Sequence, residues 1–225
     1  MAGLGLGSGA APRMHVLVVG DAPDDQVWPT IGLMKEYANQ DSQCPEIQQE
    51  AQYIQQQAQG DQKAMTQMVW QTTKGKIQFV RDEAAASSLE GFLSQTYYGA
   101  PVVELLIRPA DMAKQEIRQG DCDDFSMYAA ALLIALGIPC AFVTLAGDPT
   151  FPQNFTHVYV AAYPNGERVV IDASHGSYCG WEAPRPYARK KEWSVNGGAG
   201  DGDGSALLIA VALGVAAYFA VGAYL

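Results

Sequence analysis

The sequence predicts an α+β fold in which helices pack on a small antiparallel sheet, followed by a single apolar helix at the C-terminal end. Apolar residues recur at helical spacing between about residues 30 and 80. Three strand-like segments then follow at 140–145, 157–163 and 168–172, and a Pro-Asn-Gly-Glu turn typical of a hairpin joins the last two. The final residues form an uncharged apolar run.

Composition limits the function classes. A chain of 225 residues with 48% hydrophobic residues can bury one ordinary core. Its formal net charge of -10 argues against nucleic acid as a partner, because binding a phosphate backbone requires clustered Lys and Arg. The four cysteines are scattered without CxxC or Cys/His ligand spacing, so we expect neither a disulfide framework nor a metal site. We also expect no cofactor.

Four regions are expected along the chain. Residues 1–12 form a flexible Gly/Ala arm, residues 13–195 the folded domain, and residues 196–205 a Gly/Asp linker. Residues 206–225 supply the ~20 apolar residues that a helix needs to cross ~30 Å of hydrocarbon. We predict a transmembrane helix there, because a buried core helix would normally show a polar face.

The charges before residue 206 favour one orientation of that helix. Basic residues lie on its N-terminal side: Arg185, Arg189, Lys190 and Lys191. Such a bias keeps the flanking side in the cytoplasm, so the folded domain is expected to face the cytosol. The same apolar run would also suit a segment that inserts into a membrane only at a late stage. It would equally suit a segment that lies in a hydrophobic channel of an assembly.

The first half of the domain is expected to be mainly helical. A short strand is predicted at 14–20, and a helix at 30–39 with Thr30 as its cap. The Gln-rich segment 45–59 reads as an amphipathic helix, and Asp61 caps a further helical pattern that runs toward Arg81.

The middle of the chain leads to the most informative motif. Residues 84–109 have the Gly and Pro content of a loop with short helical turns, and Pro109 can open a short helix carrying Met112 and Ile117. An apolar helix then begins near Cys122 and ends at Gly137.

Cys122 is placed for nucleophilic chemistry. The exposed N–H groups and the dipole at a helix N-terminus favour a thiolate, and the backbone N–H of Cys122 is an expected oxyanion donor. Three acids surround the thiol, at Asp121, Asp123 and Asp124, and repulsion from them disfavours the thiolate. The site therefore requires a positive partner, for which histidine is the natural choice.

The hairpin supplies that partner. His157 begins one strand and Asp172 ends the next, so antiparallel pairing brings the imidazole and the carboxylate to the same end of the sheet. We expect the helix bearing Cys122 to direct its N-terminus toward this end. Nucleophile, base and orienting carboxylate then follow in the order Cys, His, Asp.

These segments resemble a known family. GDCDDFSMYAAALLIALGIP, THVYV and VVIDAS are similar to the three core motifs of the transglutaminase-like superfamily, whose catalytic arrangement is papain-like. The helical lead-in from PEIQQEAQYIQQQ to VRDEA, followed by ELLIRPADMA, resembles short bacteriophage and prophage members. The resemblance covers roughly residues 25–180. It implies a transglutaminase-like fold with Cys122 as nucleophile, His157 as base and Asp172 as the third member.

Some residues near the motif have less defined roles. No tryptophan aligns with the oxyanion side chain of many members, and Gln119 is the substitute donor. Asp124 is assigned to the cleft as a substrate contact. His175 is also a candidate for binding substrate, although it could instead be a loop residue or replace His157 as the base.

The expected reaction is attack of the thiol on an amide carbonyl, with release of an acyl-enzyme to water or to an amine. Water gives a peptidase or amidase and an amine gives a protein cross-linker, so the expected partner is a protein or peptide. The alternative is a non-catalytic structural or ejection component of a phage particle, in contact with other phage structural proteins. A third possibility is a membrane-tethered module that binds peptides without turnover.

Overall fold

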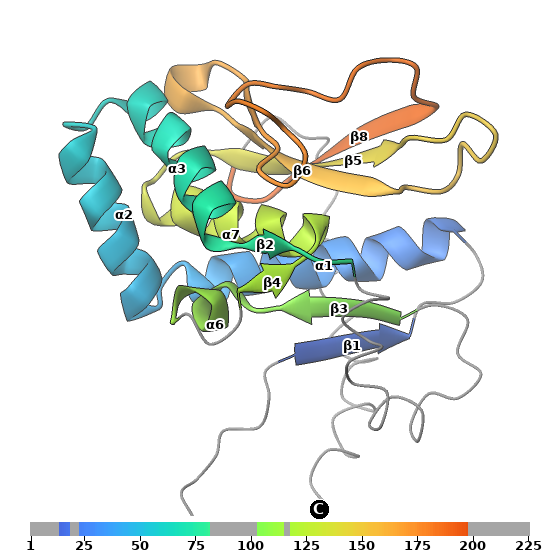
Figure 1. Cartoon of the computed structure of the whole chain (residues 1–225), viewed down its shortest axis with the longest axis horizontal. Coiled ribbons are helices and arrows are strands. Elements are labelled where there is room, and N and C mark those ends of the chain that lie inside the picture. Colours follow the sequence, from blue (N-terminus) through green and yellow to red (C-terminus); the bar gives the residue numbers. More distant parts are fainter. Residues whose placement is uncertain (1–13, 19–22, 82–102, 115–117, 198–225) are drawn as a thin grey trace, which may run out of the picture.

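The architecture is built around one buried helix, α7 (Cys122–Ala135), which packs against a four-stranded sheet. The computed structural model describes residues 14–18, 23–81, 103–114 and 118–197. The strands of the sheet are β5 (Cys140–Ala146), β6 (His157–Ala162), β7 (Val169–Ile171) and β8 (Arg189–Ser194). They lie in the order β7-β6-β5-β8, and every neighbouring pair is antiparallel. The α+β fold with helices on an antiparallel sheet is confirmed (Figure 1).

The β6–β7 hairpin is the part of the sheet that positions the site. Val160 pairs with Ile171 and Ala162 with Val169. A turn at Pro164–Gly166 joins the two strands, and Asn165 adopts a φ of 53°, in the left-handed region that Asn tolerates. This register brings the start of β6 and the end of β7 to the same end of the sheet.

Three helices precede the sheet in sequence and pack on α7: α1 (Pro23–Asp41), α2 (Pro45–Gln57) and α3 (Gln62–Lys76). The predictions of α2 and of the Asp61 cap of α3 are confirmed, since the Asp61 carboxylate accepts from two backbone N–H groups. The prediction for α1 was wrong at its start. Pro29 lies inside this helix, and Thr30 is not its cap. The preceding Trp28 packs edge-on against Trp193 of β8, with ring centroids 4.3 Å apart.

The helical pattern that was predicted to run toward Arg81 ends at Lys76. The chain then becomes extended, and β2 (Gln78–Phe79) pairs in parallel with β4 (Gln119–Gly120). Ile77, a β-branched residue, lies where the helix gives way to extended chain, and its φ of −105° and ψ of 129° are those of a strand. After Ile77 the backbone N–H groups no longer bond within the helix. Those of Gln78 and Val80 donate hydrogen bonds to the carbonyls of Arg118 and Gly120, in the segment just before Cys122.

Part of the predicted loop at 84–109 is a strand. β3 (Val103–Ile107) pairs antiparallel with β1 (Met14–Val18), and α6 (Pro109–Ala113) follows it as predicted. Ile117 lies outside the described residues.

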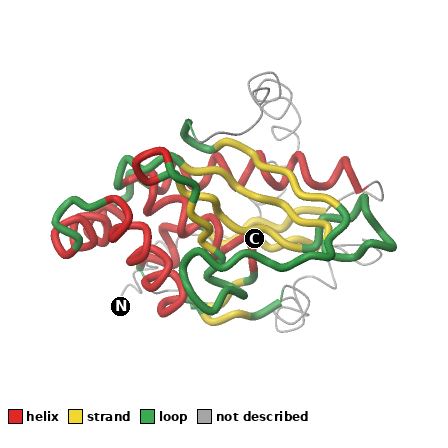
Figure 2. Tube along the Cα trace, turned by 90° about the horizontal axis from the view of Figure 1, so that it is seen from above, coloured by secondary structure: helices red, strands yellow, loops and turns green. Residues whose placement is uncertain are grey.

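Two apolar clusters cover the two faces of the four-stranded sheet. On the inner face Phe142, Val158 and Val160 pack against α7 and the other helices. Seen from above, the strands lie side by side, with helices beside the sheet and partly behind it (Figure 2). On the outer face Tyr159 and Val143 belong to a second cluster, against which residues from the segment between β7 and β8 pack.

The strand β8 was not predicted. Its basic residues had been interpreted as flanking charges of a membrane helix, but in the structure they pair with β5. The ammonium of Lys191 lies 4.4 Å from the ring centroid of Trp28 and 3.9 Å from that of Trp193, so its charge is placed against two aromatic rings. The predicted linker lies outside the described residues from residue 198 on, as does the whole apolar run 206–225. Within the described ranges, no helix has the length and apolar character needed to span a membrane.

Candidate active site

The first turn of α7 is held by a network of acids. Asp121 is the N-cap, and its carboxylate accepts from the N–H of Asp123 at 3.3 Å. The Asp124 carboxylate accepts in return from the N–H of Asp121 at 3.2 Å, which completes a capping box. Cys122 is thus the first residue of the helix and is half-buried.

Asp124 does not lie where a substrate contact was predicted. Its side chain is fully buried, with 0% exposure. One carboxylate oxygen accepts from Ile107 N–H of β3 at 2.7 Å, and the other belongs to the capping box. A Cβ on Gly120 would lie only 2.5 Å from the capping oxygen, so the backbone before Cys122 approaches this carboxylate closely. The role of Asp124 is therefore to fix the start of α7.

A buried serine joins the Cys122 turn to the strand of His157. Ser126 Oγ lies 2.6 Å from the carbonyl oxygen of Cys122, one turn earlier, and 3.2 Å from the carbonyl oxygen of Val158. Both contacts use one hydroxyl, so the first turn of α7 is packed directly on the start of β6. This contact brings the elements that carry Cys122 and His157 together.

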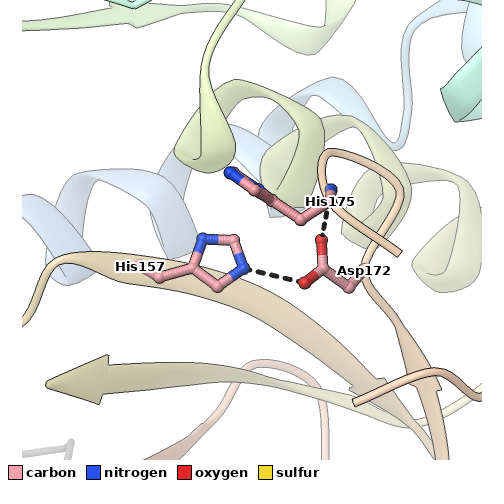
Figure 3. A group of neighbouring side chains, drawn as sticks. All are labelled: His157, Asp172 and His175. Atoms are coloured by element: carbon pink, nitrogen blue, oxygen red, sulfur yellow. Dashed lines mark hydrogen bonds and ion pairs between the residues drawn. The ribbon is translucent and has the colours of Figure 1, made fainter. Parts of the chain in front are cut away.

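His157 and Asp172 are brought together by the hairpin. His157 Nε2 lies 2.8 Å from Asp172 Oδ2 (Figure 3). The His157 side chain keeps 13% of its surface exposed, while Asp172 is only 1% exposed. An ionised carboxylate can only accept, so Nε2 carries the proton and the lone pair of the neutral ring stands on Nδ1. Nδ1 is the nitrogen that faces away from Asp172.

Asp172 is held as an anion in a buried position. Burial alone would raise its pKa, but hydrogen bonding and charge from His157, together with bonds from His175 and Ser174, hold that pKa below its ordinary value. The second oxygen accepts from His175 N–H at 2.9 Å and from Ser174 Oγ at 3.0 Å. The backbone carbonyl accepts from the indole N–H of Trp70 at 3.1 Å, which ties the residue to α3.

The second histidine lies beside the first. The rings of His175 and His157 meet edge to face, with centroids 4.6 Å apart. Ser174 Oγ donates its single proton to Asp172, so the contact of 2.9 Å between Ser174 and His175 Nδ1 is a bond from the imidazole N–H. Burial first, and then repulsion from His157 whenever that ring is protonated, lower the pKa of His175, which favours the neutral ring.

Phe79 is a further aromatic residue of the site. Its ring is large and apolar, but 38% of its surface is exposed. Its ring centroid lies 5.1 Å from that of His175 and 6.3 Å from that of Phe125 on α7. An exposed aromatic ring between His175 and Phe125 of α7 is suited to contact an apolar group of a ligand. Gln119, the predicted oxyanion residue, is exposed on β4, three residues before Cys122.

The structure describes all four cysteines, and none of them forms a disulfide. Burial raises the pKa of the Cys140 thiol to about 12 and that of the Cys179 thiol to about 11. Cys44 caps α2 by accepting from Ile47 N–H at 3.5 Å, and burial raises the pKa of its thiol. These three thiols therefore stay protonated near neutral pH.

Comparison with known proteins gives likenesses at the level of the fold. The chain is similar to a "putative protease" from Parabacteroides distasonis, with a TM-score of 0.47 and 12% identity over 79% of this chain and 30% of that one. It is similar to a "putative cysteine protease" from Cytophaga hutchinsonii, with a TM-score of 0.35 and 14% identity over 65% of this chain and 52% of that one. A structure described as a TGase gives a TM-score of 0.37 and 16% identity over 68% and 34%.

These likenesses do not decide the family. Each of the three TM-scores lies below 0.5, and this chain spans about a third to a half of the length of each structure. No protein-family model and no curated protein matches the chain. The function is therefore inferred from the residues of the site.

Proposed function

We propose that the chain is a cysteine-dependent amide hydrolase or acyltransferase of the transglutaminase-like superfamily, with Cys122 as nucleophile, His157 as base and Asp172 as the orienting carboxylate. The observation that carries the proposal is the 2.8 Å bond from His157 Nε2 to the buried anion of Asp172. This bond fixes the proton of His157 on Nε2, which supports a neutral imidazole whose Nδ1 can accept a proton. A bond of this kind at a strand end, beside the first turn of a helix that begins with cysteine, is what a thiol nucleophile requires.

The proposed reaction begins with transfer of the thiol proton to His157 Nδ1. The negative charge of Asp172 stabilises the imidazolium that forms, and the thiolate sulfur attacks the carbonyl carbon of an amide. The imidazolium then protonates the leaving amine as the C–N bond breaks, which leaves a thioester on Cys122. Water or a second amine attacks the thioester and returns the thiol.

The developing oxyanion requires donors that point into the site. The N–H groups of Asp123 and Asp124 are engaged by carboxylates of the cap, and that of Phe125 bonds to the carbonyl of Asp121. We keep the backbone N–H of Cys122 as the proposed donor because it is the first of the helix. Gln119 stays a proposed second donor, and its exposed position leaves it free to turn toward a bound substrate.

Protein or peptide chains are the proposed substrates. Phe79 and His175 would bind the residues that flank the reacting amide, since His175 is exposed beside His157 and Phe79 is partly exposed beside His175. Hydrolysis and transamidation share the acyl-enzyme and differ only in the acceptor, so the proposal covers both outcomes.

The test uses dimethylated casein, an unfolded polypeptide whose amines are blocked. Fluorescamine then reports new amino groups from hydrolysis, and incorporation of monodansylcadaverine reports transamidation. The wild-type chain should give one of these products, Cys122→Ala should give none, and Cys179→Ala should keep the activity because its thiol is half-buried and protonated. Equal product from wild type and Cys122→Ala would contradict the proposal and favour the non-catalytic component of a phage particle.

We also propose a place for the protein. Residues 206–225 would attach it to a membrane with the catalytic domain in the cytoplasm, or serve membrane contact from within a phage particle alongside other structural proteins. Fractionation of cells that produce the full chain and a chain ending at residue 197 tests this. Membrane recovery of both forms would contradict attachment through the apolar run.

A further inference from the structure

Two imidazoles and one carboxylate gather at the site in an arrangement that thiol chemistry does not require. His157, Asp172 and His175 each offer a ligand atom, and these three atoms all lie within 4.8 Å of one another (Figure 3). A nucleophile needs one imidazole as a base and one carboxylate to orient it. The second imidazole, which borders the proposed substrate, is therefore not needed as an acid or base in the proposed reaction.

The donor set suits one class of metal ion. Imidazole nitrogen with a single carboxylate is typical of Zn²⁺ and its neighbours among the late transition metals, whereas Ca²⁺ and Mg²⁺ prefer sets made of oxygen. Zinc bonds of about 2.0–2.2 Å place neighbouring ligands about 3.3–3.6 Å apart in a tetrahedron. His157 Nε2 and Asp172 Oδ2 stand at 2.8 Å, so they need to separate only slightly. The His175 ligand atom lies within 4.8 Å of the other two, so it needs to approach them by at most about 1.5 Å.

The groups behind the ligands hold them in place. Ser174 Oγ links two of them, at 2.9 Å from His175 Nδ1 and 3.0 Å from Asp172 Oδ1. The N–H of His175 bonds to the same carboxylate oxygen, and Trp70 fixes the Asp172 carbonyl. Hydrogen-bonded neighbours of this kind orient metal ligands and raise affinity. Access is also provided, because the His175 side chain is exposed.

We propose that His157, Asp172 and His175 bind one Zn²⁺ ion, and that this ion reversibly inhibits the enzyme by occupying both members of the His157–Asp172 pair. The binding part stands on the geometry alone, whereas the inhibition part rests on the proposed function. The cysteine spacing, which led us to expect no metal, could not indicate this site because no cysteine belongs to its ligand set.

Binding is tested without catalysis. The full chain carrying Cys122→Ala, treated with EDTA and dialysed, is titrated with Zn²⁺ by calorimetry and with Co²⁺ by visible absorption. We expect one ion per chain and the absorption of tetrahedral Co²⁺. Adding His175→Ala should weaken binding at least about tenfold. Adding His15→Ala, which alters the third histidine of the chain, should leave binding unchanged.

Two results would overturn the site: absence of one-to-one binding in the Cys122→Ala chain, or binding that His175→Ala leaves unaltered. Circular dichroism of each variant shows whether the fold is kept, and a second variant, His175→Gln, which keeps a polar side chain, should weaken binding in the same way. Retention of full affinity by His175→Gln would also contradict the assignment.

Inhibition is tested on the wild-type chain with dimethylated casein. Zn²⁺ should abolish turnover, EDTA should restore it, and His175→Ala should need at least about tenfold more Zn²⁺ for the same loss. An active chain that neither binds nor responds to Zn²⁺ overturns this inference and leaves the proposed function standing. A chain that binds Zn²⁺ but never turns over overturns the proposed function and leaves the site standing.

Discussion

Replacing Asp172 by Asn should remove most of the activity while leaving the fold in place. Asn has the shape of Asp, and the two donors that bond Asp172 Oδ1, the N–H of His175 and the hydroxyl of Ser174, would hold the amide oxygen at that position. The amide NH₂ would then face His157 Nε2. Because two donors cannot bond to each other, His157 must place its proton on Nδ1, where it can no longer accept the proton of a thiol.

The size of the loss follows from the bond that is removed. A hydrogen bond to a charged group contributes about 1.5–3 kcal/mol, and each 1.36 kcal/mol is a factor of about ten, so loss of the bond alone costs about 10-fold to 150-fold. The wrong tautomer adds to this, and the same substitution in a Ser-His-Asp triad lowers kcat by about 10⁴. We therefore expect turnover by Asp172→Asn to fall by about 10² to 10⁴.

The assay is the release or incorporation of amines with dimethylated casein, with thermal unfolding measured on the same samples. A stability loss of about 1.5–3 kcal/mol lowers the Tm of a domain of this size by about 3–12 °C, which leaves the variant folded at 25 °C. Asp148→Asn, on an exposed turn, is the matched control and should keep full activity. If folded Asp172→Asn kept more than a tenth of the wild-type rate, Asp172 would not orient the base.

Three further predictions concern the support of the site and the sheet. The Tyr128 hydroxyl bonds to the Glu50 carboxylate, so Tyr128→Phe should lower the free energy of unfolding in urea by about 1.5–3 kcal/mol, and an unchanged value would contradict this. Gly120→Ala should cost about 1–3 kcal/mol, because the new Cβ overlaps the capping carboxylate of α7, and it should also slow alkylation of the thiol that follows; normal stability and labelling would refute it. Burial raises the pKa of Glu182, but bonds from Arg168 and its neighbours outweigh this and lower it from 4.5 to about 2. The stability from this group is therefore present above about pH 4.5 and lost as pH falls toward 2, so Glu182→Gln should lower the free energy of unfolding at pH 7 and not at pH 2. An equal loss at both pH values would rule this out.

The hairpin and the Cys122 helix could be predicted from sequence because their signals are local. A Pro-Asn-Gly-Glu turn between two apolar runs fixes the register, and that register decides that the end of one strand meets the start of the other. Asp121 directly before Cys122, with Asp124 three residues after Asp121, forms the pattern of a capping box. The contact between His157 and Asp172 follows from the register.

The remaining features depend on contacts between distant segments. β8 carries consecutive basic residues without clear alternation, and its strand depends on pairing with the edge of β5 and on the contact of Lys191 with Trp28 and Trp193. An Asp beside the nucleophile could either contact substrate or stabilise the helix. The bond from Ile107 N–H of β3 to the buried Asp124 joins distant segments, so no local pattern indicates it. Phe79 reads as core by composition, and only the parallel pairing of β2 with β4 places it at the site.

The most direct measurement of the central claim is the rate at which iodoacetamide modifies each cysteine of the native chain at neutral pH, read by mass spectrometry of peptides. Burial raises the pKa of Cys140 to about 12 and of Cys179 to about 11, so these thiols provide the reference for unactivated cysteines in the same molecule. We predict that Cys122 reacts at least about ten times faster than either and that His157→Ala removes this advantage. Equal and slow modification of all of them, or fast modification of Cys122 in His157→Ala, would contradict a thiolate activated by His157.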